Sequence, residues 1–488
     1  MRKALGLFAV VIFFTLCMAE AQEKLFVVSA QGSDSTDEIY RFDVAGPHGP
    51  VRLDLVMRGE NLMQPYGVAF GPGNELFVTN RAWSRGVPSV ARFLRPASRV
   101  PQFNGLIPFL DPAPSGAVFR AGELFVVHAG SGLVSRFLLD DQGNASPNGA
   151  IAMDASIRNA TVNPVTGEMF VTQCWMNQIS RFLFDPDGNA IPNGTITDPS
   201  LDNPHDLVFD DKGELFVANA FGGTVSRFTF DNTGNAVPNG VIAYNPGAIG
   251  LAFSPWGELF VSSHFQPTVF RWTFDTTGQA HSNGSFATPQ TLGDLGFLPV
   301  ASKTTVITSG SPSFVGQPVT FTANVISKYG SIPDGEPVTF YDGTRALGSV
   351  ALANGTAAYV TSSLSAKTHY IKAVYAGDAT FLRGTGLLHQ IVNKYPTTTT
   401  LSSSSRRSTY GQPVTFTATV TPTGPYPLTG KVKFWDRMLP IGSTTLNGGA
   451  ASMTTSKLLT GTHLIAAQYL GDAADDTSTS SALTHVVQ

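Results

Sequence analysis

Short apolar runs separated by glycine, asparagine, aspartate and proline recur along the first part of the chain. One phrase, a Glu or Lys followed by Leu or Met and then Phe-Val, occurs six times, and an arginine and an aromatic residue follow each copy. Apolar runs of this length between turn-forming residues predict short β-strands. The last four intervals between copies are 48, 45, 46 and 44 residues. The copies begin at Lys24, Glu75, Glu123, Glu168, Glu214 and Glu258.

Two further phrases complete the repeat. Five copies are preceded by a small-apolar run such as Asp206–Phe209, and four are followed by a phrase of the general form D-x-x-G-N-A-x-P-N-G. Three or four strands in about 45 residues is the period of a β-propeller blade. The first copy lacks the upstream strand, and Asp294–Phe297 supplies it at the far end of the array. We therefore predict a six-bladed β-propeller over residues 22–300, closed by its last strand so that no sheet edge is free.

The stretch NPHDLVFDDKGELFVAN (Asn203–Asn219) resembles the repeat phrase of NHL proteins. The array as a whole is similar to the NHL and TolB-like six-bladed propellers. This resemblance covers the predicted propeller and implies its fold. It implies no single function, because propellers host lyases, lactonases and pure binders.

The repeated residues have predicted structural roles. The Glu of the phrase and the Arg before the aromatic residue lie on neighbouring antiparallel strands, where we expect them to pair. Phe216, Val208 and Phe228 and their equivalents are predicted to form the core between blades. The D-x-x-G phrase is typical of turns. Asp185 and Asp187 also resemble part of a calcium loop, but the other copies lack the second carboxylate, which favours a plain turn.

The pattern changes from about Ala301, where Thr and Ser become more frequent. The phrase GQPVTFTA begins at Gly316 and again at Gly411, and its apolar and polar residues alternate as in a half-buried strand. About seven such strands in ~95 residues fit a β-sandwich. We predict Ig-like domains over 301–393 and 394–488, and hence an all-β chain with a propeller followed by two Ig-like β-sandwiches in tandem.

The two sandwich units resemble bacterial Ig-like domains of group 3, which occur on secreted and cell-surface bacterial proteins. The resemblance covers nearly all of 301–488 and implies spacer or adhesive roles. His369 and His463 stand at matching positions in the two units. We expect both to be hydrogen-bonded residues near strand ends and not ligands.

The start of the chain predicts export. Two basic residues, the apolar run Ala4–Met18 and an A-x-A site are typical of a signal peptide, which we assign to residues 1–21. Leu16 next to Cys17 makes a poor lipoprotein box. We expect a secreted, extracellular or cell-surface protein without a membrane span, with the periplasm as an alternative. Cys174 is then the one cysteine of the mature chain, so no internal disulfide can form.

Charge narrows the class of partner. The formal net charge is −4, from 31 basic and 35 acidic residues, and no basic run stands out. A nucleic-acid-binding protein or a protein held electrostatically at a membrane would carry a basic patch. The charge therefore argues against nucleic acid and a membrane surface, and the partner that we expect is a glycan, a peptide or another surface component. The sequence leaves the oligomeric state open.

Two sets of residues are predicted to meet around the propeller channel, because the end of one strand and the start of the next share a face. A rim of polar groups there is a plausible ligand site. The alternative is that these residues cap strand ends and bind water. The first set is Ser29, Asn80, His128, Gln173, Asn219 and Ser263, and the second is Tyr66, Ser115, Asn159, His205, Ile249 and Gly293.

Histidines on this face raise the alternative of a metal site. His128, His205 and His264 could hold a divalent ion that activates water or a substrate. The NHL-like amidoglycolate lyases use such histidines, whereas the metal set of gluconolactonase-like propellers has no clear match here. Asp206 and Asp294 are the rim acids that the pattern places. No cofactor is assigned, and a divalent metal in the channel remains the alternative.

Aromatic residues form a second candidate feature of the same face. Trp175, Phe221 and Phe265 follow the polar rim by two residues in three successive blades, and Trp83 lies in a longer loop. Such rings can stack on sugars or anchor a peptide. Alternatively they pack against the neighbouring blade. Cys174 beside them is expected to be a buried thiol and not a nucleophile.

The sequence therefore favours a secreted binding or adhesion protein. The propeller would recognise a glycan, peptide or small ligand, and the Ig-like units would act as spacers. One alternative is a propeller metalloenzyme, a lyase or lactonase with a metal near His128 and His205. Another is a structural surface or matrix protein without a ligand site. The sequence does not decide whether the chain catalyses a reaction, but it favours a protein that is not an enzyme.

Overall fold

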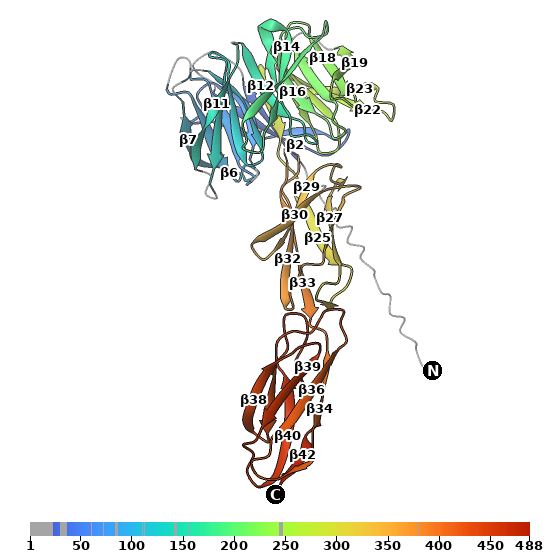
Figure 1. Cartoon of the computed structure of the whole chain (residues 1–488). Helices are drawn as coiled ribbons and strands as arrows, with labels where there is room; N and C mark the ends of the chain where they lie inside the picture. Colours follow the sequence, from blue (N-terminus) through green and yellow to red (C-terminus); the bar gives the residue numbers. More distant parts are fainter. Residues whose placement is uncertain are drawn as a thin grey trace, which may run out of the picture. The chain divides into compact units, whose positions relative to one another are not determined.

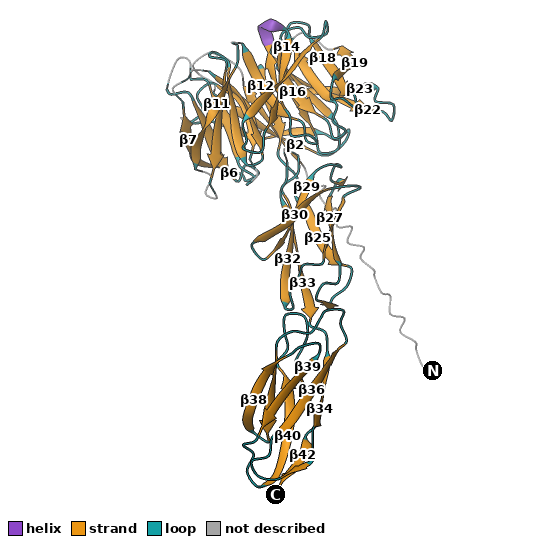
Figure 2. Ribbon diagram, in the orientation of Figure 1, coloured by secondary structure: helices purple, strands orange, loops and turns teal. Residues whose placement is uncertain are grey.

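The computed structural model describes residues 23–29, 37–59, 61–71, 73–82, 86–109, 111, 113–140, 144–154, 156–243, 247–378 and 380–488. Its regular structure consists of β-strands and one short 3-10 helix, η1 (Cys174–Met176), within these residues (Figure 2). No helix in the described part is long and apolar enough to span a bilayer. The predicted signal peptide and Trp83 lie outside the described residues.

Six four-stranded antiparallel sheets occupy the described residues between Glu23 and Phe297 (Figure 1). From the inner strand outwards they are β24 (Leu292–Phe297), β1 (Glu23–Ser29), β2 (Ile39–Val44), β3 (Val51–Met57); β4 (Pro65–Phe70), β5 (Leu76–Asn80), β6 (Ser89–Leu94), β7 (Gln102–Pro108); β8 (Pro114–Arg120), β9 (Glu123–His128), β10 (Leu133–Leu139), β11 (Ala145–Ala152); β12 (Ile157–Val162), β13 (Met169–Gln173), β14 (Gln178–Phe184), β15 (Ala190–Thr197); β16 (Pro204–Phe209), β17 (Leu215–Asn219), β18 (Thr224–Phe230), β19 (Ala236–Ala243); and β20 (Ala248–Phe253), β21 (Leu259–Ser263), β22 (Thr268–Phe274), β23 (Ala280–Ala287).

The inner strands form a closed ring. Each contacts the inner strands of the two neighbouring sheets, and β24 contacts β4. β24 pairs with β1, with Leu25 opposite Phe297 and Val27 opposite Leu295. The predicted closure by the C-terminal strand is thus confirmed, and it joins both ends of the array in one sheet.

Apolar clusters fill the interfaces between adjacent sheets. One joins β17 and β18 to β20 and β21 and includes Phe216 and Leu259; another joins β1 and β2 to β21 and includes Phe260. Phe216 and Phe228 are each 1% exposed, as predicted for the core between blades, while Val208 is partly buried. The alternating strand pattern therefore places one set of side chains between sheets.

The predicted Glu–Arg pairs are confirmed. Arg136 donates to Glu123 over 2.9 and 2.8 Å, and the pairs of the next three sheets have the same bidentate geometry. Arg136 also donates to the Gly188 carbonyl of the next sheet at 2.8 Å. An asparagine of the D-x-x-G phrase, Asn148, completes the site by donating to Glu123 at 2.7 Å. This phrase therefore forms a turn and also part of the outer strand.

Two β-sandwiches follow, and the predicted all-β fold of a propeller with Ig-like domains is confirmed. The first has sheets β25-β27-β28, with β31 on β27, and β26-β33-β32-β29-β30; the second has β34-β36-β39 and β35-β42-β40-β37-β38, with β41 on β40. Their bounds are β25 (Ser302–Thr308), β26 (Ser313–Phe314), β27 (Val319–Ser327), β28 (Gly330–Ser331), β29 (Pro337–Asp342), β30 (Arg345–Ala351), β31 (Thr356–Thr361), β32 (Thr368–Tyr375), β33 (Gly384–Asn393), β34 (Thr397–Ser403), β35 (Arg407–Ser408), β36 (Val414–Pro422), β37 (Lys431–Asp436), β38 (Leu439–Thr445), β39 (Ala450–Thr455), β40 (Gly461–Tyr469), β41 (Ser478–Thr479) and β42 (Leu483–Val487).

The matching histidines are hydrogen-bonded in both sandwiches, as expected. The ring of His369 lies 2.8 Å from Asp342, and the ring of His463 lies 2.5 Å from Asp436. Burial works against protonation of His463, yet its hydrogen bonds to Asp436 and to a backbone carbonyl raise its pKa. Both histidines therefore fix loop positions.

The chain divides into two compact units. The first reaches Ser302 and also includes Ile326–Glu336 and Ala376–Gly384. The second comprises Lys303–Val325, Pro337–Tyr375 and Thr385–Gln488.

Candidate functional site

Each inner strand of the propeller carries an extra residue near its start. In β16 the partners are Pro204–Asn219 and Asp206–Ala218, so two residues of β16 oppose one of β17. The same register shift occurs in the other five inner strands. Such bulges redirect side chains and are common next to functional sites. The extra residues are Tyr66, Ser115, Arg158, His205, Ile249 and Gly293.

The mouth of the channel is basic. The Tyr66 hydroxyl lies 3.5 Å from Nδ1 of His205, which belongs to the sheet three places away. The guanidinium of Arg81 lies 3.1 Å from the centre of the Tyr66 ring. Burial, followed by the charges of Arg158, Arg81 and His264, lowers the pKa of His205 to about 3. His205 is therefore neutral at pH 7, and the guanidinium groups of Arg158 and Arg81 are the positive charges that act on it.

Next to these rim positions, a layer of polar side chains links neighbouring sheets by hydrogen bonds. Asn159 donates to Asp206 at 2.6 Å, and Asp206 accepts from the backbone of Leu207 and of Leu251 in the next sheet at 2.8 and 2.6 Å. Asp294 accepts from Val68 at 3.1 Å in the same way. Each side chain thus links its own sheet to the next.

Asp206 and Asp294 share this layer as an acid pair. Both carboxyl groups are buried and lie close enough for each to affect the protonation of the other. Burial raises the pKa of Asp206 to about 7, and burial and the charge of Asp206 raise that of Asp294. The pair is predicted as rim acids by sequence, and the structure places it below the rim with its oxygens committed to the fold.

Glycines leave room for this layer. A Cβ at Gly116 would lie 2.0 Å from the Asn159 Oδ1 and 3.0 Å from its Cα, and Gly67 and Gly250 are similarly enclosed. One equivalent position follows the bulge in each of the six inner strands. Three of these positions hold polar residues (Asn159, Asp206 and Asp294) and three hold glycines (Gly67, Gly116 and Gly250).

We expect Gly116→Ala to destabilise the propeller by about 1–3 kcal/mol, because the added methyl group must displace Asn159 from Asp206. Gly73→Ala is the matched control, since its nearest atom, the Glu75 Cγ, lies 4.0 Å from the added Cβ. Denaturant unfolding followed by tryptophan fluorescence measures both changes. Equal stability of the two variants would contradict this account of the layer.

The position of one predicted residue needs correction. Asn159 belongs to the deeper layer, and Arg158 occupies the rim position equivalent to His205. The turn after β12 runs from Asn163 to Glu168, one residue longer than the turns from Asp210 to Glu214 and from Ser254 to Glu258. The sequence prediction located the rim residues by counting back from the repeated Glu-Leu-Phe-Val phrase. In this sheet the longer turn makes that count wrong by one residue. Arg158 was missed for this reason.

The first predicted set is buried. Ser29, Asn80, His128, Gln173, Asn219 and Ser263 are all 0–3% exposed. Five of them make hydrogen bonds inside their own sheet or its loops; the Asn219 amide, for example, donates to Ser226 at 2.8 Å and accepts from Asp202 at 3.0 Å. These contacts fit the capping role, which was the alternative to a ligand rim.

His128 has a different environment from His205. It packs edge-on against Phe109 at 4.9 Å between ring centres, and its Nδ1 lies 3.8 Å from Asp111. Burial lowers its pKa. The neighbours of His205 are instead Tyr66, Arg158, Arg81 and His264, so the structure does not bring the two predicted metal ligands together. Nowhere in the described ranges do three or more His, Cys, Asp or Glu side chains form a group able to hold a metal ion.

The three predicted aromatic residues are exposed. Trp175, Phe221 and Phe265 are 65%, 58% and 61% exposed and lie in the β13–β14, β17–β18 and β21–β22 loops. Trp175 and Phe221 meet edge-to-face, with ring centres 5.7 Å apart. The alternative that these rings pack against the neighbouring blade holds for this pair, because Trp175 and Phe221 belong to loops of adjacent sheets. Cys174 is buried, as expected, and its thiol lies 3.0 Å from the Ser156 carbonyl.

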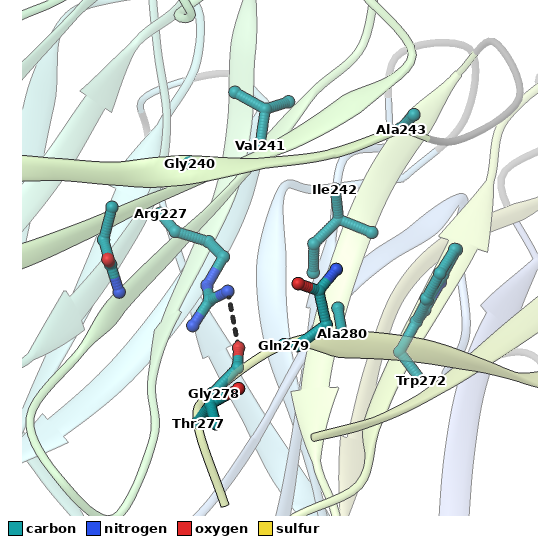
Figure 3. A pocket seen from close by; sticks show the side chains of 11 residues that line it. Arg227, Gly240, Val241, Ile242, Ala243, Trp272, Thr277, Gly278, Gln279 and Ala280 are labelled. Atoms are coloured by element: carbon teal, nitrogen blue, oxygen red, sulfur yellow. Dashed lines mark hydrogen bonds between the residues drawn. The ribbon is translucent and has the colours of Figure 1, made fainter. Parts of the chain in front are cut away.

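A separate cavity of about 460 Å³ lies between outer strands (Figure 3). Arg227 points into it and donates to the Gly278 carbonyl at 2.9 Å, while its other nitrogens bind Glu214. Trp272 lines the opposite side. Because Arg227 is hydrogen-bonded to Glu214 and to the Gly278 carbonyl, we interpret this cavity as a packing gap beside the Glu–Arg pair and not as a ligand site.

Comparisons with known proteins agree with the sandwich prediction. The sequence model of the bacterial Ig-like domain (group 3) matches residues 305–392 and 400–488, so the predicted resemblance is confirmed there. A solved structure of a protein from Lactobacillus plantarum is 13% identical, with a TM-score of 0.44 over 69% of this chain and 99% of that chain. The periplasmic gluconolactonase PpgL of Pseudomonas aeruginosa is 16% identical, with a TM-score of 0.43 over 70% of this chain and 99% of that chain. No curated protein matches the sequence.

Proposed function

We propose that the chain is a bacterial recognition protein whose propeller binds a ligand through its β13–β14, β17–β18 and β21–β22 loops. The observation that carries this proposal is the exposure of Trp175, Phe221 and Phe265 in three consecutive sheets. Folded domains bury most rings of this size, and aromatic residues in the strands, such as Phe216 and Phe260, are almost fully buried. Adjacent exposed rings beside a polar site are typical of binding surfaces. We call Trp175, Phe221 and Phe265 the aromatic shelf.

The remaining parts of the chain support presentation of this surface. Domains of the bacterial Ig-like type are typical of extracellular and surface proteins. We therefore propose export through the signal peptide at 1–21, a propeller over 22–300 and spacer domains over 301–393 and 394–488. The proposed partner is a glycan, peptide or small ligand met outside the cell, and the function is binding.

Glycan and peptide arrays probed with residues 22–488 test this proposal. We expect Trp175→Ala to weaken binding of an array-identified ligand by roughly tenfold or more, because a contacted aromatic ring contributes over about 1.4 kcal/mol. Phe103→Ala is the control, since Phe103 is 44% exposed but lies on the outer strand β7. Equal affinity of wild type and Trp175→Ala would reject the aromatic shelf as the binding surface.

A further inference from the structure

The basic mouth of the channel and the aromatic shelf are neighbours. His264 is close enough to His205 to affect its protonation, and its ring lies 5.3 Å from that of Phe265. On the other side, the Asn203 side chain donates to the Cys174 carbonyl at 3.3 Å and so ties η1, which carries Trp175, to the start of β16. A ligand on the shelf would therefore reach the channel mouth.

The mouth holds a donor that the described residues leave unused. The Nε of Arg158 is buried and has no hydrogen-bond partner among them. A buried donor without a partner destabilises the fold, so such groups usually serve a ligand or a water. Arg158 is the bulge residue of β12, as His205 is of β16, and its charge contributes to the lowered pKa of His205.

The groups around Arg158 favour an anion. Arg81 adds a second guanidinium, and its charge and that of Arg158 repel each other. The acid pair below carries less than its full negative charge at neutral pH, because burial raises the pKa of both Asp206 and Asp294. A carboxylate matches the planar fork of an arginine with two parallel hydrogen bonds. The Tyr66 hydroxyl, close to His205, offers a further polar contact.

We propose that the channel mouth is an anion-binding subsite in which Arg158, next to Arg81, holds the carboxylate of an acidic saccharide while its sugar rings stack on the aromatic shelf. This inference rests on the proposed function and adds the chemical class of the ligand. Sugar rings suit the shelf because their C–H faces pack on exposed aromatic rings, and a uronic acid carries ring and carboxylate in one residue.

The test compares uronate oligosaccharides with their methyl esters, which are the same sugars without the charge. Residues 22–488 are titrated by calorimetry at low salt with a panel of both forms. We expect the acid form to bind roughly tenfold or more tightly than the ester, because a hydrogen bond to a charged group is lost with esterification. The preference should shrink as salt is added.

Two variants assign the effect. Arg158→Gln is expected to reduce the affinity for the acid to that for the ester, and Trp175→Ala is expected to weaken both. Arg158→Lys keeps the charge but not the fork, and should retain part of the preference. Thermal unfolding of each variant verifies its fold, and Arg158→Lys serves if Arg158→Gln does not fold.

Each outcome decides between the two ideas. Equal binding of acid and ester, or binding of neutral glycans alone that Trp175→Ala abolishes, would overturn the anion subsite and leave the proposed function standing. Tighter binding of phosphorylated or sulfated sugars than of uronates would overturn the carboxylate assignment. No binding of any uronate would overturn the inference, and arrays on which Trp175→Ala changes nothing would also reject the proposed function.

Discussion

Glu258→Ala is expected to lower the free energy of unfolding of the propeller by about 3–5 kcal/mol, because it leaves a buried arginine without its partner. The Glu258 side chain is 1% exposed and accepts both hydrogen bonds of Arg271 at 2.8 Å. It also accepts from Trp256 at 3.1 Å and from Asn283. Arg271 in turn donates to the Gly49 carbonyl at 2.9 Å, which connects the last sheet to the first.

Denaturant unfolding followed by tryptophan fluorescence measures this loss, and Glu214→Ala provides the comparison. Glu214 makes the same bidentate pair with Arg227, but its side chain is 12% exposed, against 1% for Glu258. Water can reach the arginine left behind in that variant, so we expect a smaller loss. The double variant Glu258→Ala/Arg271→Ala should be less destabilised than the sum of the single variants. Losses below about 1 kcal/mol for Glu258→Ala would show that the pair behaves as a surface ion pair.

The repeat predicted these pairs and the closure because both depend on local rules. Strand neighbours in an antiparallel hairpin are fixed by the turn between them, so a Glu and an Arg at constant spacing must face each other. The first copy of the repeat lacks an upstream strand, and the array ends with one extra strand. The sequence therefore predicted the pairing of β1 with β24. Composition and alternation sufficed for the sandwiches, which the match to the bacterial Ig-like domain confirms.

The site depended on details that a repeat does not reveal. The rim position of Arg158 was missed because one turn is a residue longer, and Arg81 because it follows the polar position Asn80 and approaches the channel by stacking on Tyr66. The bulge in every inner strand is invisible in a single sequence, since an extra residue leaves the hydrophobic pattern intact. The sequence predicted the polar rim as a set of positions. It could not predict whether each side chain faces a ligand or its own loop, because this depends on the direction of the side chain.

The exposure of the aromatic shelf also lay beyond the pattern. Phe221 and Phe216 have the same residue type and lie five positions apart, yet they are 58% and 1% exposed. Strand alternation predicts the burial of Phe216, whereas loop residues have no period. The loops of the propeller therefore carry the features that distinguish one sheet from the next, while its strands carry the features that all sheets share.

Asp294→Asn is expected to reduce the pH dependence of propeller stability between pH 5 and 8. The pKa of Asp206 rises to about 7 and that of Asp294 rises as well, so the folded state keeps a proton that the unfolded state releases. Stability from such groups is complete below the ordinary Asp pKa and is lost as the pH rises through the raised value. We expect a loss on the order of 2–4 kcal/mol in the wild type. Asparagine cannot ionise and removes one of the two buried groups with a raised pKa, so the variant should lose less.

Melting temperatures measured from pH 5 to 8 test this expectation, with Asp231→Asn as the control. Asp231 lies in an exposed turn, where hydrogen bonds from Thr233 and Asn235 lower its pKa. Its contribution to stability is present above the ordinary Asp pKa and is lost only as the pH falls through the lowered value, so Asp231→Asn should leave the slope between pH 5 and 8 unchanged. If Asp294→Asn also left the slope unchanged, the two buried carboxyl groups would not retain a proton in this pH range. The layer beneath the basic mouth would then carry more negative charge, and the attraction of Arg158 and Arg81 for an anionic ligand would be correspondingly weaker.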